Sequence, residues 1–267
     1  MESLHQHLKQ PLNMYSIFGY LLPGFFLTTL LIIDYDVSSI LRLRSRMTPV
    51  KLLDIKSLDL KLNYILDFFS SGTLSDFKFI PFILFLLFCY LLGHLVSAFS
   101  SFFLERFILK VFLGYPSTVL ADADKEIKYP LLLGNYRTPL NKEMLKEIKR
   151  EIKKTFGFKV ATKDYYWLMY SFIITKRPYL APRVHHFVNL YGFSRNMSAT
   201  FIIYISLRLT FLRFIANSTI DWAVWTVMTL FAISAMFMFW NYLKLFKRQA
   251  IDIYFLFLAI QNDKAID

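Results

Sequence analysis

A stripe of polar side chains runs along one long apolar segment and is the part of this sequence best suited to chemistry. The stripe has five residues spaced 4, 3, 4 and 4 apart, namely Tyr90, His94, Ser97, Ser101 and Glu105. At about 100° per residue, this spacing places all five side chains on one face of a helix. Ionisable groups in apolar surroundings usually face a water-filled cavity or a bundle interior, so the stripe is a candidate site.

Three interpretations of the stripe follow from its residue types. Helix packing is the simplest, because hydroxyl groups and small residues such as Gly93 let helices approach closely. A water-filled path or pore is the second, with His94 as a proton-sensitive gate. An intramembrane reaction on lipid is the third, with His94 and Glu105 moving protons.

A second polar stripe occurs in a later apolar segment, where four residues recur at every fourth position: Asn196, Thr200, Tyr204 and Arg208. Arg208 and His94 each lie about ten residues from the expected cytoplasmic ends of their helices. A rise of about 1.5 Å per residue gives them similar depths, so they could share a central path. No acidic residue lies near the middle of any predicted span. Arg208 therefore needs hydroxyls, carbonyls, water, lipid phosphate or a neighbouring chain, or it extends toward the headgroups.

Arg195 and Glu105 should lie together at the cytoplasmic boundary of the membrane. Glu105 directly follows the apolar segment 79–104, and Arg195 shortly precedes the apolar segment 198–215. An ion pair between these two side chains would join the second and third spans.

Basic residues gather just before the third predicted span and could bind an anionic ligand or lipid headgroup. They are Lys176, Arg177, Arg183, His185, His186 and Arg195. A phosphate site and a juxtamembrane collar are the two interpretations, and the collar is the simpler one. His185 and His186 lack carboxylates or cysteines at ligand spacing, so no metal site is expected.

The segment from Asn141 to Phe156 has the clearest pattern of a soluble amphipathic helix. Its apolar face consists of Met144, Leu145, Ile148 and Ile152. Asn141 is expected to cap this helix and Gly157 to end it. The other face interleaves lysines and Arg150 with three glutamates, which predicts a solvated surface with i,i+4 ion pairs, although it could bind an anionic ligand. The apolar block 251–260 is too short to cross a membrane and should pack on this domain or on a neighbouring subunit.

The apolar segments predict a mainly α, four-helix transmembrane protein. Residues 79–104 contain no formal charge over 26 residues unless His94 is protonated, and about 20 apolar residues suffice to cross a bilayer. The four predicted spans are 15–33, 79–104, 198–215 and 222–243. Only residues 216–221 separate the last two spans, so these should form an antiparallel hairpin with a short outer loop.

The distribution of Lys and Arg orients the predicted spans. Residues 105–197 contain 17 of the 31 basic residues, whereas residues 34–78 contain seven. Cytoplasmic segments carry an excess of Lys and Arg, which places both termini (1–14 and 244–267) and the small 105–197 domain in the cytoplasm. Residues 34–78 then lie outside. Within them, residues 40–47 alternate apolar and basic side chains, which predicts a strand.

Composition narrows the function classes. The chain is 56% hydrophobic with a net charge of +12, which suits contact with an anionic membrane surface. Its single cysteine, Cys89, allows no intrachain disulfide and no cysteine zinc site. It contains no G-x-x-x-x-G-K-[ST], G-x-G-x-x-G, H-E-x-x-H or G-x-S-x-G motif, so we expect no cofactor and neither a nucleotide hydrolase nor a hydrolase of the soluble type. No aromatic and basic nucleic-acid module is present, so direct nucleic-acid binding is not expected.

Three short stretches resemble known sequences. They are FGYLLPG (Phe18 to Gly24), GHLVSAFSS (Gly93 to Ser101) and NLYGFSRNMS (Asn189 to Ser198). They resemble stretches of uncharacterised bacterial four-span membrane proteins, some of which are associated with anti-phage defence. The resemblance implies a membrane effector or sensor subunit that works with a cytoplasmic partner, and it assigns no catalytic residue.

These observations predict a non-enzymatic, homo-oligomeric, multi-pass protein of the bacterial inner membrane. Its output would be a pore or another perturbation of the bilayer, controlled by a cytoplasmic protein partner or ligand. Two alternatives from other classes stay open. A scaffold would recruit a cytoplasmic partner to the membrane, and a lipid-directed enzyme would use the polar stripe for catalysis.

Overall fold

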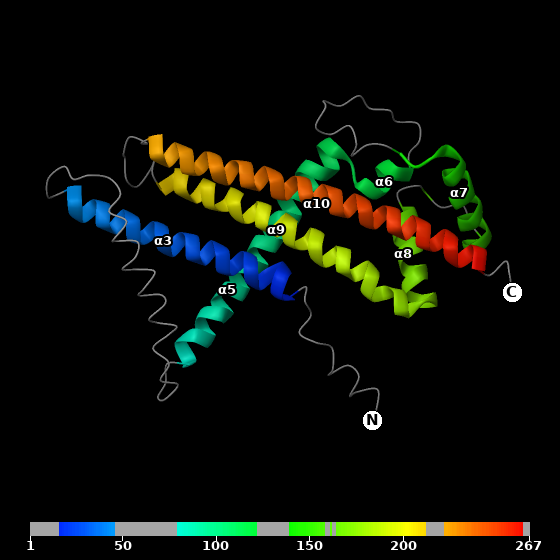
Figure 1. Cartoon of the computed structure of the whole chain (residues 1–267), viewed down its shortest axis with the longest axis horizontal. Coiled ribbons are helices and arrows are strands. Elements are labelled where there is room, and N and C mark those ends of the chain that lie inside the picture. Colours follow the sequence, from blue (N-terminus) through cyan, green and yellow to red (C-terminus); the bar gives the residue numbers. More distant parts are fainter. Residues whose placement is uncertain are drawn as a thin grey trace.

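The computed structural model describes residues 16–45, 79–121, 139–157, 161, 164–211 and 222–263, and these residues are almost entirely helical (Figure 1). No strand occurs within them, so the predicted mainly α class is confirmed. The predicted terminus 1–14, most of the outer segment 34–78 and the outer loop 216–221 lie outside the described residues.

The first apolar segment begins with a π-helical turn, η1 (Ile17–Leu21), and continues as α3 (Leu22–Ser45). The π turn lies directly before Pro23, whose missing N–H interrupts α-helical hydrogen bonding. The predicted strand is wrong for residues 40–45, because α3 extends through them. Leu and Arg form helices well, and extending an existing helix avoids the cost of nucleation, so the helix prevails over the alternating pattern.

The second apolar segment forms one continuous helix that changes from α-helical to π-helical hydrogen bonding along its length. α5 (Phe79–Ser100) is α-helical, and η2 (Ser101–Leu113) continues it as a π-helix. The Gly114 N–H donates to the Leu109 carbonyl at 2.6 Å, which is the i to i+5 bond of a π-helix. Gly114 ends the helix at a φ of 77°, which glycine adopts without steric cost.

The last two apolar segments form an antiparallel pair that is longer than predicted. A short 3-10 turn, η5 (Pro178–Leu180), leads into α9 (Ala181–Thr210), and α10 (Trp222–Asp263) returns beside it. α9 begins well before the predicted span at 198. α10 continues through the predicted tail as one helix of 42 residues.

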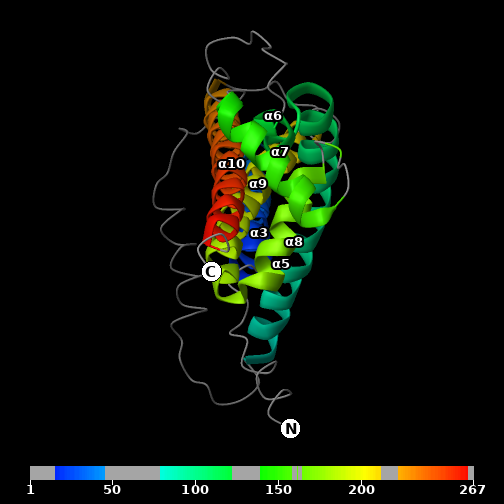
Figure 2. The ribbon, with the colours of Figure 1, turned by 90° about the vertical axis from the view of Figure 1, so that its right-hand side faces the viewer.

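Four helices, α3, α5, α9 and α10, pack into one bundle (Figures 1 and 2). The stretches Phe82–Ala121 and Val224–Asn262 are long and apolar enough to cross a membrane. Only 22% and 11% of their most apolar parts are buried within the molecule, unlike the core helices of a soluble protein. Ile17–Ile33 is also apolar but shorter.

A separate core lies where α10 terminates, and we call this part the distal domain. It consists of α6 (Pro116–Ala121), α7 (Lys142–Phe156), α8 (Tyr165–Lys176) and α10 from residue 244 onward. Its buried side chains include Ile148, Ile152, Met169, Ile173, Ile253, Tyr254 and Phe257. The prediction that the block 251–260 packs on this domain is therefore confirmed.

α7 matches the amphipathic helix predicted for this region. The Asn141 side chain accepts a hydrogen bond from the Glu143 N–H at 3.2 Å, and Gly157 ends the helix at a φ of 72°. The predicted apolar face is turned inward, with Leu145, Ile148 and Ile152 buried and Met144 packed beside them. Local capping rules and the 3.6-residue period thus account for this helix.

Tyr254 links α10 to α6 inside the distal domain. Its hydroxyl donates to the Ser117 carbonyl at 2.6 Å. Burial raises the pKa of Tyr254, and it also raises the pKa of Tyr166, so both phenols stay neutral at physiological pH.

Truncating Ile148 to alanine should lower the temperature at which the distal domain unfolds. The side chain is completely buried, and such a truncation costs about 2–5 kcal/mol. Lys149→Ala, on the exposed face of α7, is the control and should leave the transition almost unchanged. Heating followed by far-ultraviolet circular dichroism measures both variants. Identical transitions in the two variants would contradict the packing of α7.

Candidate functional site

A largely buried ion pair between packed helices joins α9 to η2. Nη1 of Arg195 donates to Oε1 of Glu105 at 2.5 Å, so the predicted pair is confirmed. Nη2 of Arg195 also donates to the Ser97 hydroxyl of α5 at 3.2 Å. The Arg195 side chain is 8% exposed and the Glu105 side chain is 25% exposed. A charge buried to this extent is tolerated only with a partner.

Asn196 extends this ion pair into a network that reaches η1. Its Nδ2 donates to the Gly19 carbonyl at 2.6 Å. Its Oδ1 accepts from the Ser100 hydroxyl at 2.6 Å and from Nε of Arg195 at 3.2 Å. Asn196 is completely buried and uses both ends of its amide, as buried polar groups require. We call the following set the central network: Ser97, Ser100, Glu105, Arg195 and Asn196.

α10 contacts the central network and its immediate neighbours through three hydrogen bonds. The Tyr242 hydroxyl donates to Oε1 of Glu105 at 3.4 Å. Nδ2 of Asn241 donates to the Ser194 hydroxyl at 2.8 Å, and the Ser198 hydroxyl donates to the Ala235 carbonyl at 2.9 Å. Polar contacts from η1, α5, η2, α9 and α10 therefore meet in one place.

Two glycines allow η1 and α3 to approach α5 closely. A methyl group on Gly93 would overlap the Tyr20 carbonyl, and one on Gly24 would overlap the Cys89 carbonyl. Both obstacles are backbone atoms, which cannot move aside as the end of a side chain can. The close approach accompanies the contact of the Gly19 carbonyl with Asn196. Small residues serve this packing role between membrane helices.

The stripe predicted along the second apolar segment divides between two environments. Ser97 and Glu105 belong to the central network, and Ser101 lies between them, half-buried. η2 has the wider turns of a π-helix, so the 3.6-residue period used for the prediction holds only as far as Ser100.

His94 lies outside the central network, on the exposed surface of the bundle. Its ring stacks on Tyr20 with 4.0 Å between ring centroids, and it meets the edge of Tyr90 at 4.5 Å. Within the described part of the chain, His94 makes ring contacts but no hydrogen bond. A central path shared with Arg208 needs both side chains in the bundle interior, which is not where His94 lies.

The second predicted stripe, along α9, contributes chiefly to packing. The Thr200 hydroxyl donates to the Asn196 carbonyl of its own helix at 3.0 Å. Tyr204 is buried in an apolar cluster and meets the edge of Phe231 at 5.0 Å. Arg208 is half-buried and lies thirteen residues beyond Arg195, which is about 20 Å along the helix.

The predicted basic set before the third span contains surface residues and one buried residue. Lys176, Arg183, His185 and His186 are exposed, and Arg177 is half-buried. Arg183 pairs with Asp252 of α10 at 3.2 Å. Arg195 is separate from this surface, because its guanidinium is held inside the central network.

Three contributors to the site were missed by the sequence reasoning: Ser100, Asn241 and Tyr242. Ser100 falls between Ser97 and Ser101 but lies off the face of the predicted stripe. Asn241 is the one amide side chain in the predicted fourth span. This isolated amide indicates a contact with another helix. A polar residue inside an apolar segment generally has a partner in a neighbouring helix.

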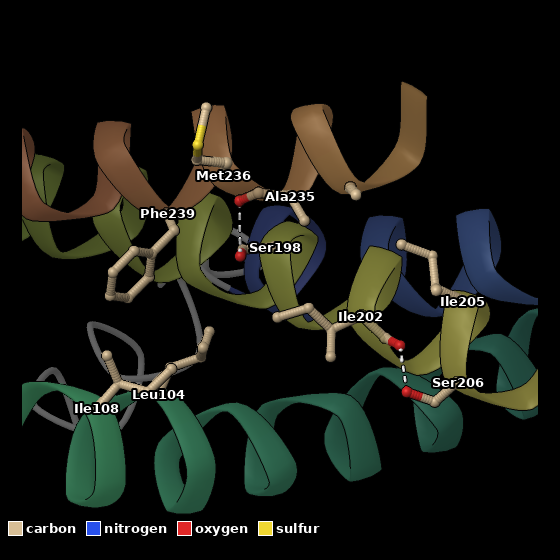
Figure 3. A pocket seen from close by; sticks show the side chains of 10 residues that line it. Leu104, Ile108, Ser198, Ile202, Ile205, Ser206, Ala235, Met236 and Phe239 are labelled. Carbon is tan, nitrogen blue, oxygen red and sulfur yellow. Dashed lines mark hydrogen bonds between the residues drawn. The ribbon is translucent and has the colours of Figure 1, made fainter. Parts of the chain in front are cut away.

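A groove of about 350 Å³ opens between η2, α9 and α10 (Figure 3). Apolar side chains form most of its wall, including Leu104, Ile108, Ile202, Met236 and Phe239. The hydroxyls of Ser198 and Ser206 in the wall donate to backbone carbonyls of Ala235 and Ile202. The groove thus suits apolar contact and offers no catalytic group. No cluster of three metal-ligating side chains occurs within the described ranges.

The three stretches for which a resemblance to bacterial four-span proteins is predicted converge on the central network. The Tyr20 carbonyl of the first stretch lies against Gly93 of the second. Asn196 of the third stretch binds both Gly19 and Ser100. In comparisons with known proteins, no family model, curated protein or solved structure matches this chain. The resemblance therefore stays a prediction.

Removing one partner of the ion pair should destabilise the bundle more than removing both. Arg195→Met leaves the Glu105 carboxylate without its cation, and Glu105→Gln leaves the guanidinium without its anion. Breaking a buried pair costs about 3–5 kcal/mol, and the double variant should recover part of the loss because no unpaired charge remains. Thermal unfolding in detergent measures all three variants. Losses that simply add would contradict this coupling.

Proposed function

We propose that this chain is a four-span, non-enzymatic effector or sensor subunit of a bacterial inner membrane, which relays changes in a cytoplasmic domain to its membrane bundle. The distal domain is the cytoplasmic part, and α3, α5, α9 and α10 cross the bilayer. One observation carries the proposal: α10 continues without a break from the apolar bundle into the core of the distal domain.

The surface of the bundle supports four crossings. α3 packs against α5 and α9 and exposes large apolar side chains such as Phe25, Phe26 and Ile32. α3 and α9 end, and α10 begins, at the end of the molecule opposite the distal domain (Figure 1). Helices that alternate in direction in this way leave both chain termini on the same side of the membrane as the distal domain. The many basic residues of segment 105–197 favour the cytoplasm as this side.

Exposed side chains support a cytoplasmic interface close to the central ion pair. Phe107, Lys110 and Phe112 are exposed on η2, and Trp240 and Lys244 are exposed on α10. Aromatic and basic residues are enriched where helices pass the headgroups. The ion pair then occupies the cytoplasmic end of the bundle, as its sequence position predicts.

Two continuous helices supply a physical connection for the relay. α10 contacts Glu105 and Ser194 through Tyr242 and Asn241, and it then enters the distal domain. α9 runs from Val184 in the distal core to Arg195 in the central network. Because neither helix is interrupted, a shift of the distal domain changes the contacts around the network instead of being absorbed by a loop.

The central network suits packing and relay better than catalysis. Glu105 and Arg195 neutralise each other, and Asn196 is satisfied by protein partners. His94 lies apart from Glu105, so the two do not form the acid–base pair that a lipid-directed enzyme needs. Altered permeability in a homo-oligomer is our first candidate output, controlled by a cytoplasmic protein partner or ligand.

A scaffold that recruits a cytoplasmic partner is the second candidate. The observation that favours it is the use of Ser97, Ser100 and Asn196 in hydrogen bonds between helices. Side chains occupied in this way are not available to line a water-filled path. The two candidates differ in whether the reconstituted protein changes membrane permeability.

Cysteine labelling should place the start of α10 outside the cell and the distal domain inside. The native Cys89 is completely buried, and Cys89→Ser provides a background without thiols. In intact bacterial spheroplasts, a membrane-impermeant maleimide should label Trp222→Cys, whose position is 75% exposed. It should label Lys149→Cys only after permeabilisation. Labelling of Lys149→Cys from outside would overturn this orientation.

Ion flux distinguishes the permeability effector from the scaffold. Vesicles containing the effector should leak ions. In a homo-oligomer the path would lie between subunits, where the exposed His94 can face it, so Arg208→Gln or His94→Leu should alter that leak. Lys154→Gln, on exposed α7, matches the charge change of Arg208→Gln and should have no effect. Flux through vesicles under an ion gradient is the measurement. Unchanged conductance in both variants would remove the pore and leave the scaffold.

A further inference from the structure

α7 presents a stripe of lysines along one side of its buried face. The stripe consists of Lys142, Lys146, Lys149 and Lys153, which are all exposed and spaced 4, 3 and 4 residues apart. This spacing keeps the four ammonium groups on one face of the helix. The other face is fixed in the distal core by Leu145, Ile148 and Ile152, so the direction of the stripe is set by packing.

The glutamates of α7 do not neutralise this stripe. Arg150 is paired with Glu147 at 3.3 Å and with Glu151 at 3.2 Å. Within the described residues, none of the four stripe lysines has an ion pair. The predicted i,i+4 pairing of lysines with glutamates is therefore replaced by pairing of two glutamates with one arginine. The stripe keeps its positive charge.

With the fourth span ending at Leu243, as the proposed topology has it, α7 lies too far from the bilayer for the headgroups of the protein's own membrane to be its partner. Gln261 of α10 donates to the Thr155 hydroxyl of α7 at 2.9 Å. Gln261 lies eighteen residues beyond Leu243, which is about 27 Å along the helix. The headgroup layer adds only about 5–8 Å beyond the hydrocarbon core. Figure 1 likewise shows α7 beside the terminal end of α10.

We propose that this stripe is the docking surface for an acidic segment of a cytoplasmic protein partner, an inference that rests on the proposed function. The charge of the stripe is complementary to a row of carboxylates at helical spacing. Docking here would act directly on the helices that pack against the end of α10. The stripe thus identifies the chemistry of the partner that the relay requires.

Two features favour an acidic protein over a nucleic acid. Glu143 and Glu147 lie beside the lysines and repel any anion. A protein segment can carry uncharged side chains opposite these glutamates, whereas a phosphate backbone is charged at every nucleotide. α7 also exposes no aromatic ring for base stacking, because Phe156 is packed against Phe172. Lysine supplies point charges and not the two-pronged contacts with which arginine reads bases.

The test measures binding of a fluorescent oligoglutamate peptide to the full-length protein in phosphatidylcholine nanodiscs. Fluorescence anisotropy should show binding that weakens as salt is raised. The triple variant Lys146→Gln, Lys149→Gln, Lys153→Gln should bind about tenfold more weakly, as expected for the loss of three exposed ion pairs. The control variant Lys110→Gln, Lys244→Gln, Arg248→Gln removes the same charge from other exposed positions and should bind as the unchanged protein does.

Three outcomes would overturn the proposal. The unchanged protein could fail to bind the peptide, or both triple variants could lose affinity equally, which would indicate net charge alone. A short duplex DNA or RNA could bind the stripe more tightly than the peptide, which would indicate nucleic acid. Circular dichroism confirms that the exposed substitutions leave the fold intact. Cysteine labelling stays independent of these results, so failure of the membrane topology is recognised separately.

Discussion

The guanidinium of Arg195 has to be neutralised inside an apolar bundle, and this requirement positions the helices around it. The carboxylate comes from η2, a hydroxyl comes from Ser97 of α5, and an amide oxygen comes from the neighbouring Asn196. Asn196 in turn needs the Gly19 carbonyl of η1. Leaving this buried charge unpaired would destabilise the fold by more than any one of these hydrogen bonds stabilises it. The five elements that contact the network, η1, α5, η2, α9 and α10, therefore depend on one another.

Sequence patterns predict the elements that obey local rules. α7 follows from an asparagine cap, a 3.6-residue apolar period and a terminal glycine. The Arg195–Glu105 pair follows because opposite charges lie at adjoining ends of two apolar segments. The packing of the block 251–260 follows from its length, since it is apolar but too short to cross a membrane. In each case the deciding information is the type of residue at particular positions of the segments concerned.

Other features depend on contacts between distant segments and are invisible to local patterns. Residue spacing predicts that the stripe lies on one helix face, but it does not predict which way each residue of that face points. The packing of η1 against α5 leaves His94 exposed. The π-helical form of η2 has no simple composition signal. Hydropathy ended the fourth span at 243, whereas lysine and arginine are good helix formers and let α10 continue. The strand expected at 40–45 failed for a similar reason, because its basic residues extend α3.

The wide turns of η2 have a consequence for movement. Its i to i+5 hydrogen bonds can be exchanged for i to i+4 bonds, because each N–H has an alternative carbonyl one residue closer. Such an exchange lengthens the helix along its axis and rotates the residues beyond the exchanged turn, while the backbone stays hydrogen-bonded. The position of Glu105 relative to Arg195 would then change without local unfolding. The bundle therefore contains a reserve of helix length, through which a screw motion of η2 can reach the buried ion pair.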